Sequence, residues 1–246
     1  MSLLFEYSIR ILPGLILLCS IYFLLPKNQT LFKVFLYIFG FILMRDAMTP
    51  LELWEFGVNG TVIWLRFIES PFILLSLGTF SLFLSILLYR NSGKLQDSIE
   101  WFSSSKTSAL LLSPLMALVI VFPFILPYFS VPVADRGGTV PLHLLPALLI
   151  FALLGNFLEE LLFRGFLQSY LKQQKVKKTK RILLSGLLFS MGHIFLALTV
   201  TNLGVMILLF TFWEGLICAL MHEKYGLISA IITHGLSIFI LSAGLL

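Results

Sequence analysis

The chain has 246 residues, of which 59% are hydrophobic and 12% are charged, and its formal net charge is +5. A soluble domain carries about 25% charged residues, so this composition excludes a water-soluble globular protein and predicts a polytopic membrane protein. In a bilayer every backbone polar group needs a partner within the protein, which leaves helices or a closed barrel. The long apolar runs favour helices over the alternating segments of a barrel.

Eight apolar runs predict an all-α transmembrane bundle of about eight spans. They cover residues 9–25, 31–44, 67–89, 109–129, 141–171, 182–198, 203–221 and 227–245. The first run is followed by Pro26-Lys27-Asn28 instead of a small-residue cleavage site, which favours a span over a signal peptide. The third run is expected to begin with a kink at Pro71.

Lysine and arginine are distributed unequally between the two ends of these spans, and such residues concentrate in cytoplasmic loops. One end collects Lys27, Lys33, Arg90, Lys94, Lys106, Lys172, Lys175, Lys177, Lys178, Lys180, Arg181 and Lys224, whereas the other has Arg10, Arg45, Arg66 and Arg136. Both termini are therefore predicted outside the cytoplasm. The small size and plain loops favour a bacterial cytoplasmic membrane. The basic run 172–181 is expected to rest on anionic headgroups and not to bind nucleic acid, since it lacks interleaved aromatic residues.

Five ionisable side chains lie well within the predicted spans, where a charged group costs about 2.5–3.5 kcal/mol on insertion scales. They are Glu159, Glu160, Arg164, His193 and His234. At about 1.5 Å per residue, the glutamate pair and the two histidines lie about 15–20 Å from the basic ends of their spans. Side chains from three helices therefore share one depth and are predicted to converge on one polar site. This depth is past the middle of a roughly 30 Å core, so access from the other side, near residues 199–202, is expected.

Helical phase separates the two adjacent glutamates. Glu160 and Arg164 are four residues apart, so they share a helix face and can pair. Glu159 is rotated by about 100° and is left free, as a general base acting on water requires. A structural ion-pair network between helices explains the same residues and stays open as an alternative.

Two further interpretations also stay open. Glu214 is a sixth, less central group: a site residue, a partner for Arg164, or a side chain that reaches toward the membrane surface. Two histidines and a glutamate are compatible with a catalytic zinc ion, but the local H-E-x-x-H spacing is absent. The sequence therefore requires neither a metal ion nor a cofactor.

Four motifs on successive spans carry a resemblance to a known family. They are Glu159-Glu160-x-x-x-Arg164, Phe189-x-x-x-His193, Phe212-x-x-Gly215 and Thr233-His234-Gly235. This ordered set resembles the CPBP family, the CAAX-protease and bacteriocin-processing (Abi) family of intramembrane proteases. The resemblance divides the chain into residues 1–139, a four-span region without recognised motifs, and residues 140–246, a CPBP-like catalytic four-helix core.

The resemblance implies an intramembrane glutamic endopeptidase of the CAAX prenyl endopeptidase type, acting on a membrane-anchored protein or peptide. By similarity, Glu159 would be the general base, His193 would orient the water, and His234 would stabilise the oxyanion. Glu160 and Arg164 would support them. No metal ion or cofactor is implied, and the oligomeric state is not indicated.

The last motif departs from the family pattern, because Ile238 stands where the family usually has an asparagine that helps form the oxyanion hole. Asn156 and Ser237 are candidate replacements. Losing one such donor costs about 10²–10³ in rate, so a non-catalytic CPBP-like scaffold, or a bacteriocin-immunity or signalling protein, remains an alternative. Ion-coupled transport would also explain buried carboxylates, but no internal repeat supports it.

Overall fold

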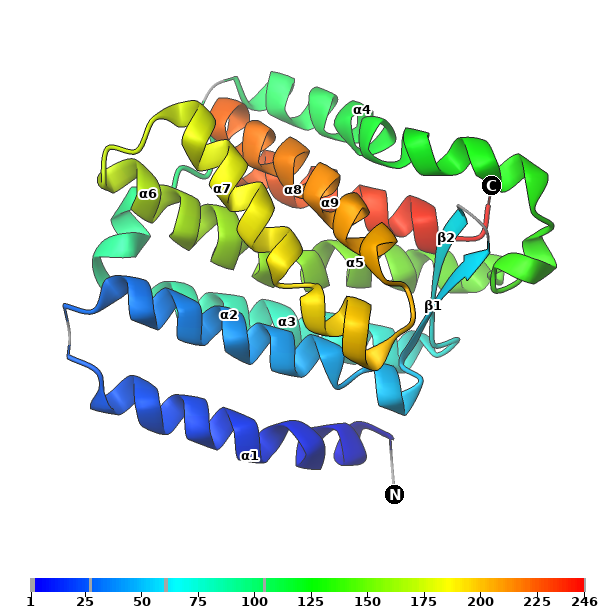
Figure 1. Ribbon diagram of the computed structural model, residues 1–246, viewed down its shortest axis with the longest axis horizontal. Helices are drawn as coiled ribbons and strands as arrows, with labels where there is room; N and C mark the ends of the chain where they lie inside the picture. Colours follow the sequence, from blue (N-terminus) through cyan, green and yellow to red (C-terminus); the bar gives the residue numbers. More distant parts are fainter. Residues whose placement is uncertain (1–2, 27, 60–61, 104, 246) are drawn as a thin grey trace.

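The computed structural model describes residues 3–26, 28–59, 62–103 and 105–245, and it shows a bundle of long helices lying side by side (Figure 1). The helices are α1 (Leu3–Leu24), α2 (Thr30–Asp46), α3 (Pro71–Asn91), α4 (Lys106–Ile125), α5 (Leu145–Glu160), α6 (Ser169–Gln173), α7 (Lys178–Met191), α8 (Val205–Tyr225) and α9 (Leu227–Ser242). Short 3-10 helices lie in the connections: η1 (Thr49–Leu51), η2 (Gly93–Ser98), η3 (Leu126–Ser130), η4 (Val133–Arg136) and η5 (Leu142–Leu144). The predicted all-α bundle is confirmed.

Two of the spans contain a π-helical segment, in which each turn holds more residues than an α-helical turn. The first, η6 (Leu161–Gln168), joins α5 to α6 within one continuous span. The second, η7 (Leu196–Val200), follows α7. The segment η6 begins directly after Glu160 and contains Arg164, and η7 begins three residues after His193.

Within the described part of the chain, six helical segments are long and apolar enough to cross a membrane: Leu3–Leu24, Pro71–Asn91, Lys106–Phe124, Leu142–Gln173, Lys178–Val200 and Val205–Tyr225. The remaining two predicted spans correspond to α2 and α9, which have 17 and 16 residues. Large apolar side chains such as Phe23, Phe122 and Phe129 are exposed on the outside of the bundle, where a bilayer would cover them. The chain is an integral membrane protein.

A β-hairpin stands between α2 and α3, where the sequence predicted only a loop. Strand β1 (Trp54–Asn59) pairs antiparallel with β2 (Val62–Phe67), and Trp54 lies opposite Phe67. Its side chains pack against the helical bundle: Val62 and Ile63 belong to the same apolar cluster as Phe210 of α8. The hairpin therefore closes one end of the bundle (Figure 1).

The expected start of the third span at residue 67 and its kink at Pro71 are wrong. Residue 67 ends β2, and α3 begins at Pro71. The Ser70 hydroxyl accepts a hydrogen bond from the Ile73 amide and caps the new helix. A proline in the first turn has no amide hydrogen to leave unsatisfied, so it starts this helix instead of bending it.

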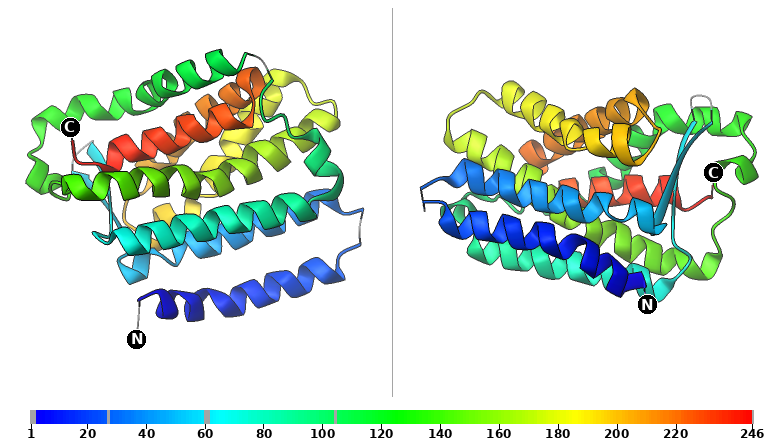
Figure 2. Two further views of the ribbon diagram at one scale, coloured as in Figure 1. Left: turned by 180° about the vertical axis from the view of Figure 1, so that it is seen from behind. Right: turned by 60° about the horizontal axis from the view of Figure 1, so that its bottom comes forward.

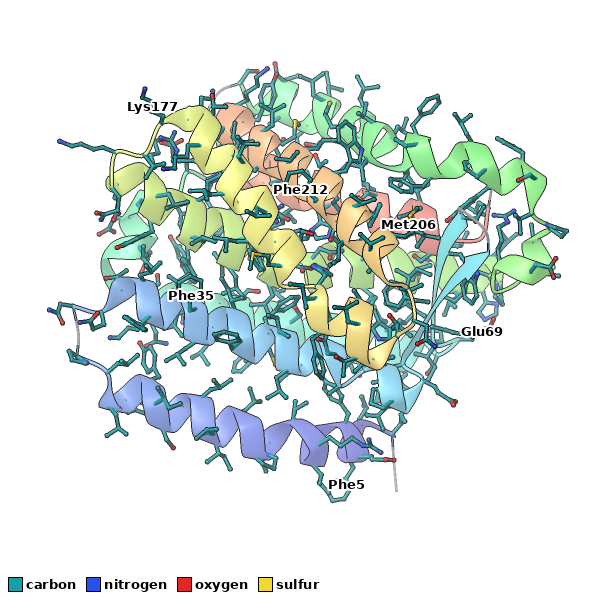
Figure 3. All side chains as sticks on the ribbon, viewed as in Figure 1. Phe5, Phe35, Glu69, Lys177, Met206 and Phe212 are labelled. Carbon is teal, nitrogen blue, oxygen red and sulfur yellow. The ribbon has the colours of Figure 1, made fainter. Side chains whose placement is uncertain are left out.

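Both termini lie at the hairpin end of the bundle, and the α6–α7 connection with Lys177 lies at the opposite end (Figures 1 and 3). Of the basic residues assigned to the predicted cytoplasmic side, Lys27 lies outside the described residues. Two views from other directions show α9 packed between α4 and α5 (Figure 2), in agreement with the contacts of these helices.

Close helix contacts at two glycines hold the centre of the bundle together. A Cβ atom at Gly215 of α8 would lie 3.1 Å from the Cα atom of Gly186 on α7. A Cβ atom at Gly235 of α9 would lie 3.0 Å from the Cα atom of Leu153 on α5. Both distances are shorter than an ordinary van der Waals contact, so a larger residue would force the neighbouring backbone to shift by a few tenths of an ångström. Glycine permits these approaches without that shift, as is common between membrane helices.

Replacing Gly235 with alanine is expected to push α9 away from α5. Overpacking of this kind costs about 1–3 kcal/mol, and unfolding in detergent would measure the loss. Gly40→Ala on α2 is the matched control, because a Cβ atom there would meet only Leu18 Cδ1 at 3.6 Å and Leu15 Cδ2 at 3.9 Å. Equal stability of the two variants would show that the close approach is not required.

Candidate active site

Ionisable side chains from four segments meet inside the bundle. Glu159 and Glu160 end α5, Glu214 lies on α8 and His234 lies on α9. His193 lies two residues beyond the end of α7, and all five side chains are buried. One carboxylate oxygen of Glu159, Oε1, lies 3.7 Å from His193 Nε2, and the other, Oε2, lies 4.0 Å from His234 Nε2. The structure thus brings together the three side chains that their predicted depths grouped.

Glu160 is the most heavily bonded of these groups. Arg164 Nη1 donates to Glu160 Oε1 at 2.7 Å, which is the pairing predicted from their spacing. His234 Nδ1 donates to the same oxygen at 2.8 Å, since a carboxylate oxygen can only accept from a neighbouring donor. Arg164 Nη2 donates to the Gly215 carbonyl at 3.0 Å, and its guanidinium carbon lies 4.3 Å from the centre of the Phe189 ring. Glu160 and Arg164 therefore connect α5, α8 and α9.

The hydrogen bond of His193 fixes which of its ring nitrogens faces the site. His193 Nδ1 lies 2.9 Å from the Phe189 carbonyl oxygen. A carbonyl oxygen cannot donate, so Nδ1 carries the hydrogen. In the neutral ring Nε2 is then an acceptor, and this nitrogen faces Glu159.

Glu159 is bonded differently from its neighbour. Among the described residues, no hydrogen-bond donor contacts Glu159 Oε1. The nearby cationic or ring nitrogens stand off by 3.7–3.8 Å, which is beyond hydrogen-bond distance. The carboxylate expected to be free for chemistry is thus free of hydrogen bonds at this oxygen.

Arg45 is a site residue that the sequence prediction missed. It was assigned to the loops at the predicted outer end, but it is 7% exposed and lies inside the bundle at the end of α2. Arg45 Nη1 lies 3.8 Å from Glu159 Oε1, and Nη2 donates to the Gly192 carbonyl at 2.8 Å. The signal that could have found it is the adjacent pair Arg45-Asp46 at the end of an apolar run.

Glu214, which the sequence left open, lies inside the site. Glu214 Oε2 is 3.6 Å from His234 Nε2, and Ser237 Oγ donates to Glu214 Oε1. Asn156 lies on the cavity wall, but its side-chain amide donates to the Ala152 carbonyl one turn earlier at 2.7 Å. Both candidate replacements for the missing asparagine thus already have acceptors.

A cavity of about 140 Å³ opens beside Glu159. Its polar wall includes Arg45, Glu159, His193, Glu214 and His234, whereas Arg164 is not part of it. The remaining wall is mostly apolar and includes aromatic rings from the first spans, the hairpin, α5 and α8. These rings belong to Phe41, Trp54, Phe56, Phe67, Phe80, Phe151 and Phe210. A mostly apolar cavity with a few convergent polar groups is the usual form of a binding site.

Comparison with protein families gives a match in the second half of the chain. Residues 141–240 match the family described as type II CAAX prenyl endopeptidase Rce1-like. The resemblance to the CAAX-protease family is confirmed over this Rce1-like segment, which contains both glutamates of α5, His193 and His234. Comparisons with curated proteins and with solved structures gave no match.

One group in the Rce1-like segment has the residue types of a metal site. Ligand atoms of Glu160, Cys218 and His234 lie within 4.8 Å of one another. Arg164 already occupies Glu160 Oε1 with a positive charge, and His234 Nδ1 donates to that same atom. A cation there would meet the guanidinium and displace a hydrogen bond, so this arrangement suits an internal ion pair better than a metal ion.

Replacing Arg164 with methionine is expected to lower the free energy of unfolding by about 3–5 kcal/mol, because Glu160 would stay buried without its cation. Unfolding in detergent measures this loss. The chain offers a matched control in the Glu6–Arg10 pair, which has the same spacing and the same 2.7 Å distance but exposed side chains. Arg10→Met is expected to change stability by less than about 1 kcal/mol, and equal losses would contradict the role of burial.

Proposed function

We propose that the protein is an intramembrane endopeptidase of glutamic type that hydrolyses a peptide bond in a membrane-anchored protein or peptide. The observation that carries this proposal is the free Oε1 atom of Glu159 facing His193 Nε2 across 3.7 Å at the wall of a buried cavity. The match of residues 141–240 to a CAAX prenyl endopeptidase family supports the same kind of enzyme.

Glu159 and His193 supply two acceptors for one water molecule. A water that donates one hydrogen to Glu159 Oε1 and the other to His193 Nε2 keeps its lone pairs directed away from both. Those lone pairs can then face a substrate carbonyl in the cavity. Glu159 is thus the general base and His193 orients the water, as general acid–base catalysis requires.

The reaction then proceeds in two steps. The water oxygen bonds to the carbonyl carbon while Glu159 takes one of its protons, which leaves a tetrahedral intermediate with a negatively charged oxygen. The carboxylates of Glu160, Glu159 and Glu214 around His234 favour a ring that is protonated on both nitrogens. Its Nε2 hydrogen, which faces the cavity, then donates to the negatively charged oxygen and stabilises it. When the C–N bond breaks, Glu159 returns the proton to the leaving nitrogen, and the products are a carboxylic acid and an amine.

Supporting residues hold these groups in place. Glu160 accepts the Nδ1 hydrogen of His234 and so directs Nε2 of that ring toward Glu159 and Glu214. Arg164 balances the charge of Glu160 from the side away from the cavity. The aromatic wall suits an apolar segment of the substrate, consistent with a substrate that is held in the bilayer.

Glu159→Ala and Glu159→Gln are both expected to abolish processing, because removal of a general base costs about 10²–10⁴ in rate. A comparison of membrane proteomes from cells with the wild type and with each variant would reveal a precursor that accumulates. Glu6→Gln, a change at an exposed glutamate of α1, is the matched control. Normal processing by a folded Glu159→Gln variant would refute the proposal and favour a non-catalytic scaffold.

We further propose that substrate reaches the cavity from the hairpin end. A surface hollow of about 820 Å³ lies there, lined in part by residues 200–203. Trp54, Phe56 and Phe67 line both this hollow and the cavity. The hairpin therefore separates the two spaces by little more than aromatic side chains. By the distribution of positive charge, this end faces away from the cytoplasm.

Thiol labelling tests this route in a background with Cys19 and Cys218 replaced. Asn156→Cys places a thiol on the cavity wall, while Glu69→Cys and Lys177→Cys mark the two ends of the bundle (Figure 3). In sealed vesicles of both orientations, an impermeant reagent is expected to label Asn156→Cys from the same side as Glu69→Cys. Labelling only from the Lys177 side would refute access from the hairpin end.

A further inference from the structure

The guanidinium of Arg45 directs one nitrogen into the site without a hydrogen-bond acceptor. Its Nε donates to Asp46 Oδ1 at 2.7 Å and its Nη2 to the Gly192 carbonyl at 2.8 Å. Its Nη1 is buried and has no partner among the described residues. A buried donor without an acceptor is costly, on the order of 1–3 kcal/mol or more when charged, so its presence calls for a physical reason.

Arg45 Nη1 lies where it can donate a hydrogen bond to a substrate carbonyl oxygen in the cavity, in addition to the hydrogen bond from His234. Arg45 lines the cavity together with Glu159, His193 and His234, and Nη1 lies 3.8 Å from Glu159 Oε1. The other arginine of the cluster, Arg164, is bonded to Glu160 and does not line the cavity. Among the described residues, Arg45 is therefore the arginine that a bound substrate can touch.

The electrostatics of the cavity favour the same role. Glu214 lines it, and Glu159 is neutral once it has taken the proton of the water. A negatively charged oxygen formed there would therefore be repelled by the Glu214 carboxylate unless a cation stood beside it. The Ser237 hydroxyl already donates to Glu214, and the Asn156 amide has one of its two hydrogens bonded to Ala152. Neither side chain carries a charge, and Ile238 on the cavity wall has no donor. Arg45 supplies both the charge and the free N–H.

The guanidinium is also held rigid before any substrate arrives. Two of its three nitrogens are bonded, and its carbon lies 5.4 Å from the centre of the Phe41 ring. A fixed donor needs no reorganisation when charge develops, which is why such donors are effective in catalysis.

We propose that Arg45 is a further catalytic residue, whose Nη1 hydrogen bonds to the negatively charged oxygen of the tetrahedral intermediate opposite His234. This inference rests on the proposed function. It adds to that function a residue of α2, outside the Rce1-like segment. No covalent change occurs at Arg45, which keeps its proton throughout.

The test uses the full chain in proteoliposomes and, as substrate, the precursor that accumulates with Glu159→Ala. Arg45→Met is expected to lower kcat by about 10²–10³, the usual cost of losing one oxyanion donor, with KM unchanged. It also leaves Asp46 buried without its cation, so the unfolding temperature is expected to fall, and kcat is measured below that temperature. Arg45→Lys keeps the charge but not the planar fork, and it serves as the second variant if Arg45→Met does not fold. It is expected to lower kcat by a smaller factor.

A second substitution separates a catalytic role from a structural one. Ile238→Asn places a side-chain donor on the cavity wall, so in the Arg45→Met background it is expected to restore kcat at least about tenfold, close to the discrimination of one hydrogen bond. A donor at position 238 cannot restore the bond from Arg45 to Gly192, so a purely structural Arg45 would not be rescued. The rescue is measured against Ile238→Asn in the wild-type background, where the new donor is expected to raise kcat by a smaller factor than it does beside Arg45→Met.

The outcomes distinguish this inference from the proposed function. If Glu159→Gln is inactive but Arg45→Met keeps the wild-type kcat, or loses it without rescue by Ile238→Asn, the inference is wrong and the proposed function stands. If Glu159→Gln processes its substrate normally, or no precursor accumulates with Glu159→Ala, the proposed function fails and the inference fails with it.

Discussion

The buried pair between Glu160 and Arg164 is the interaction on which the site depends. Both side chains are completely buried, and two charges removed from water are tolerated only when they are paired and hydrogen bonded. Here the pair is completed by His234 of α9 and the Gly215 carbonyl of α8. The need to satisfy one carboxylate therefore fixes the relative positions of three spans, and these are the spans that carry His234 and Glu214 toward Glu159.

The two adjacent glutamates show how one helix provides both stability and reactivity. Glu160 is bonded to a cation and a ring N–H, and this makes it a fixed support. Glu159, one residue earlier, faces a cavity whose wall comes about equally from residues 7–84, which include the first spans and the hairpin, and from residues 151–238. The recognisable motifs thus lie in residues 141–240, while much of the wall that would contact a substrate lies outside them.

Much of this arrangement is predictable from the sequence for simple physical reasons. The spans follow from the length of apolar runs, and the grouping of Glu159, His193 and His234 follows from the cost of charge in lipid together with depth along each helix. The Glu160–Arg164 pair follows from helical spacing. These inferences depend on local chemistry, which the chain shows directly.

The features that were missed depend on contacts between distant segments or on weaker signals. Arg45 at the end of a short apolar run looks like a loop residue, and only the packing of α2 beside residue 192 places it in the site. The hairpin carries a recognisable signal, Asn59-Gly60 between β-forming residues, but a search for long apolar runs passes over it. Pairing of Glu214 with Ser237 likewise joins two helices and cannot be read from either one alone.

The π-helical segment η6, which contains Arg164, sets the rotation of the second half of the fifth span relative to Glu159 and Glu160. Because a π turn holds more residues than an α turn, the parts of a helix before and after it are offset in phase by about one residue, or about 100°. In the fifth span, η6 separates the face that presents Glu159 from the face of α6 that leads to the basic connection. Deleting one residue there would keep all the side chains of the site but would rotate the two halves of the span relative to each other by about 100°. The site is thus sensitive to the number of residues in the span as well as to their identity.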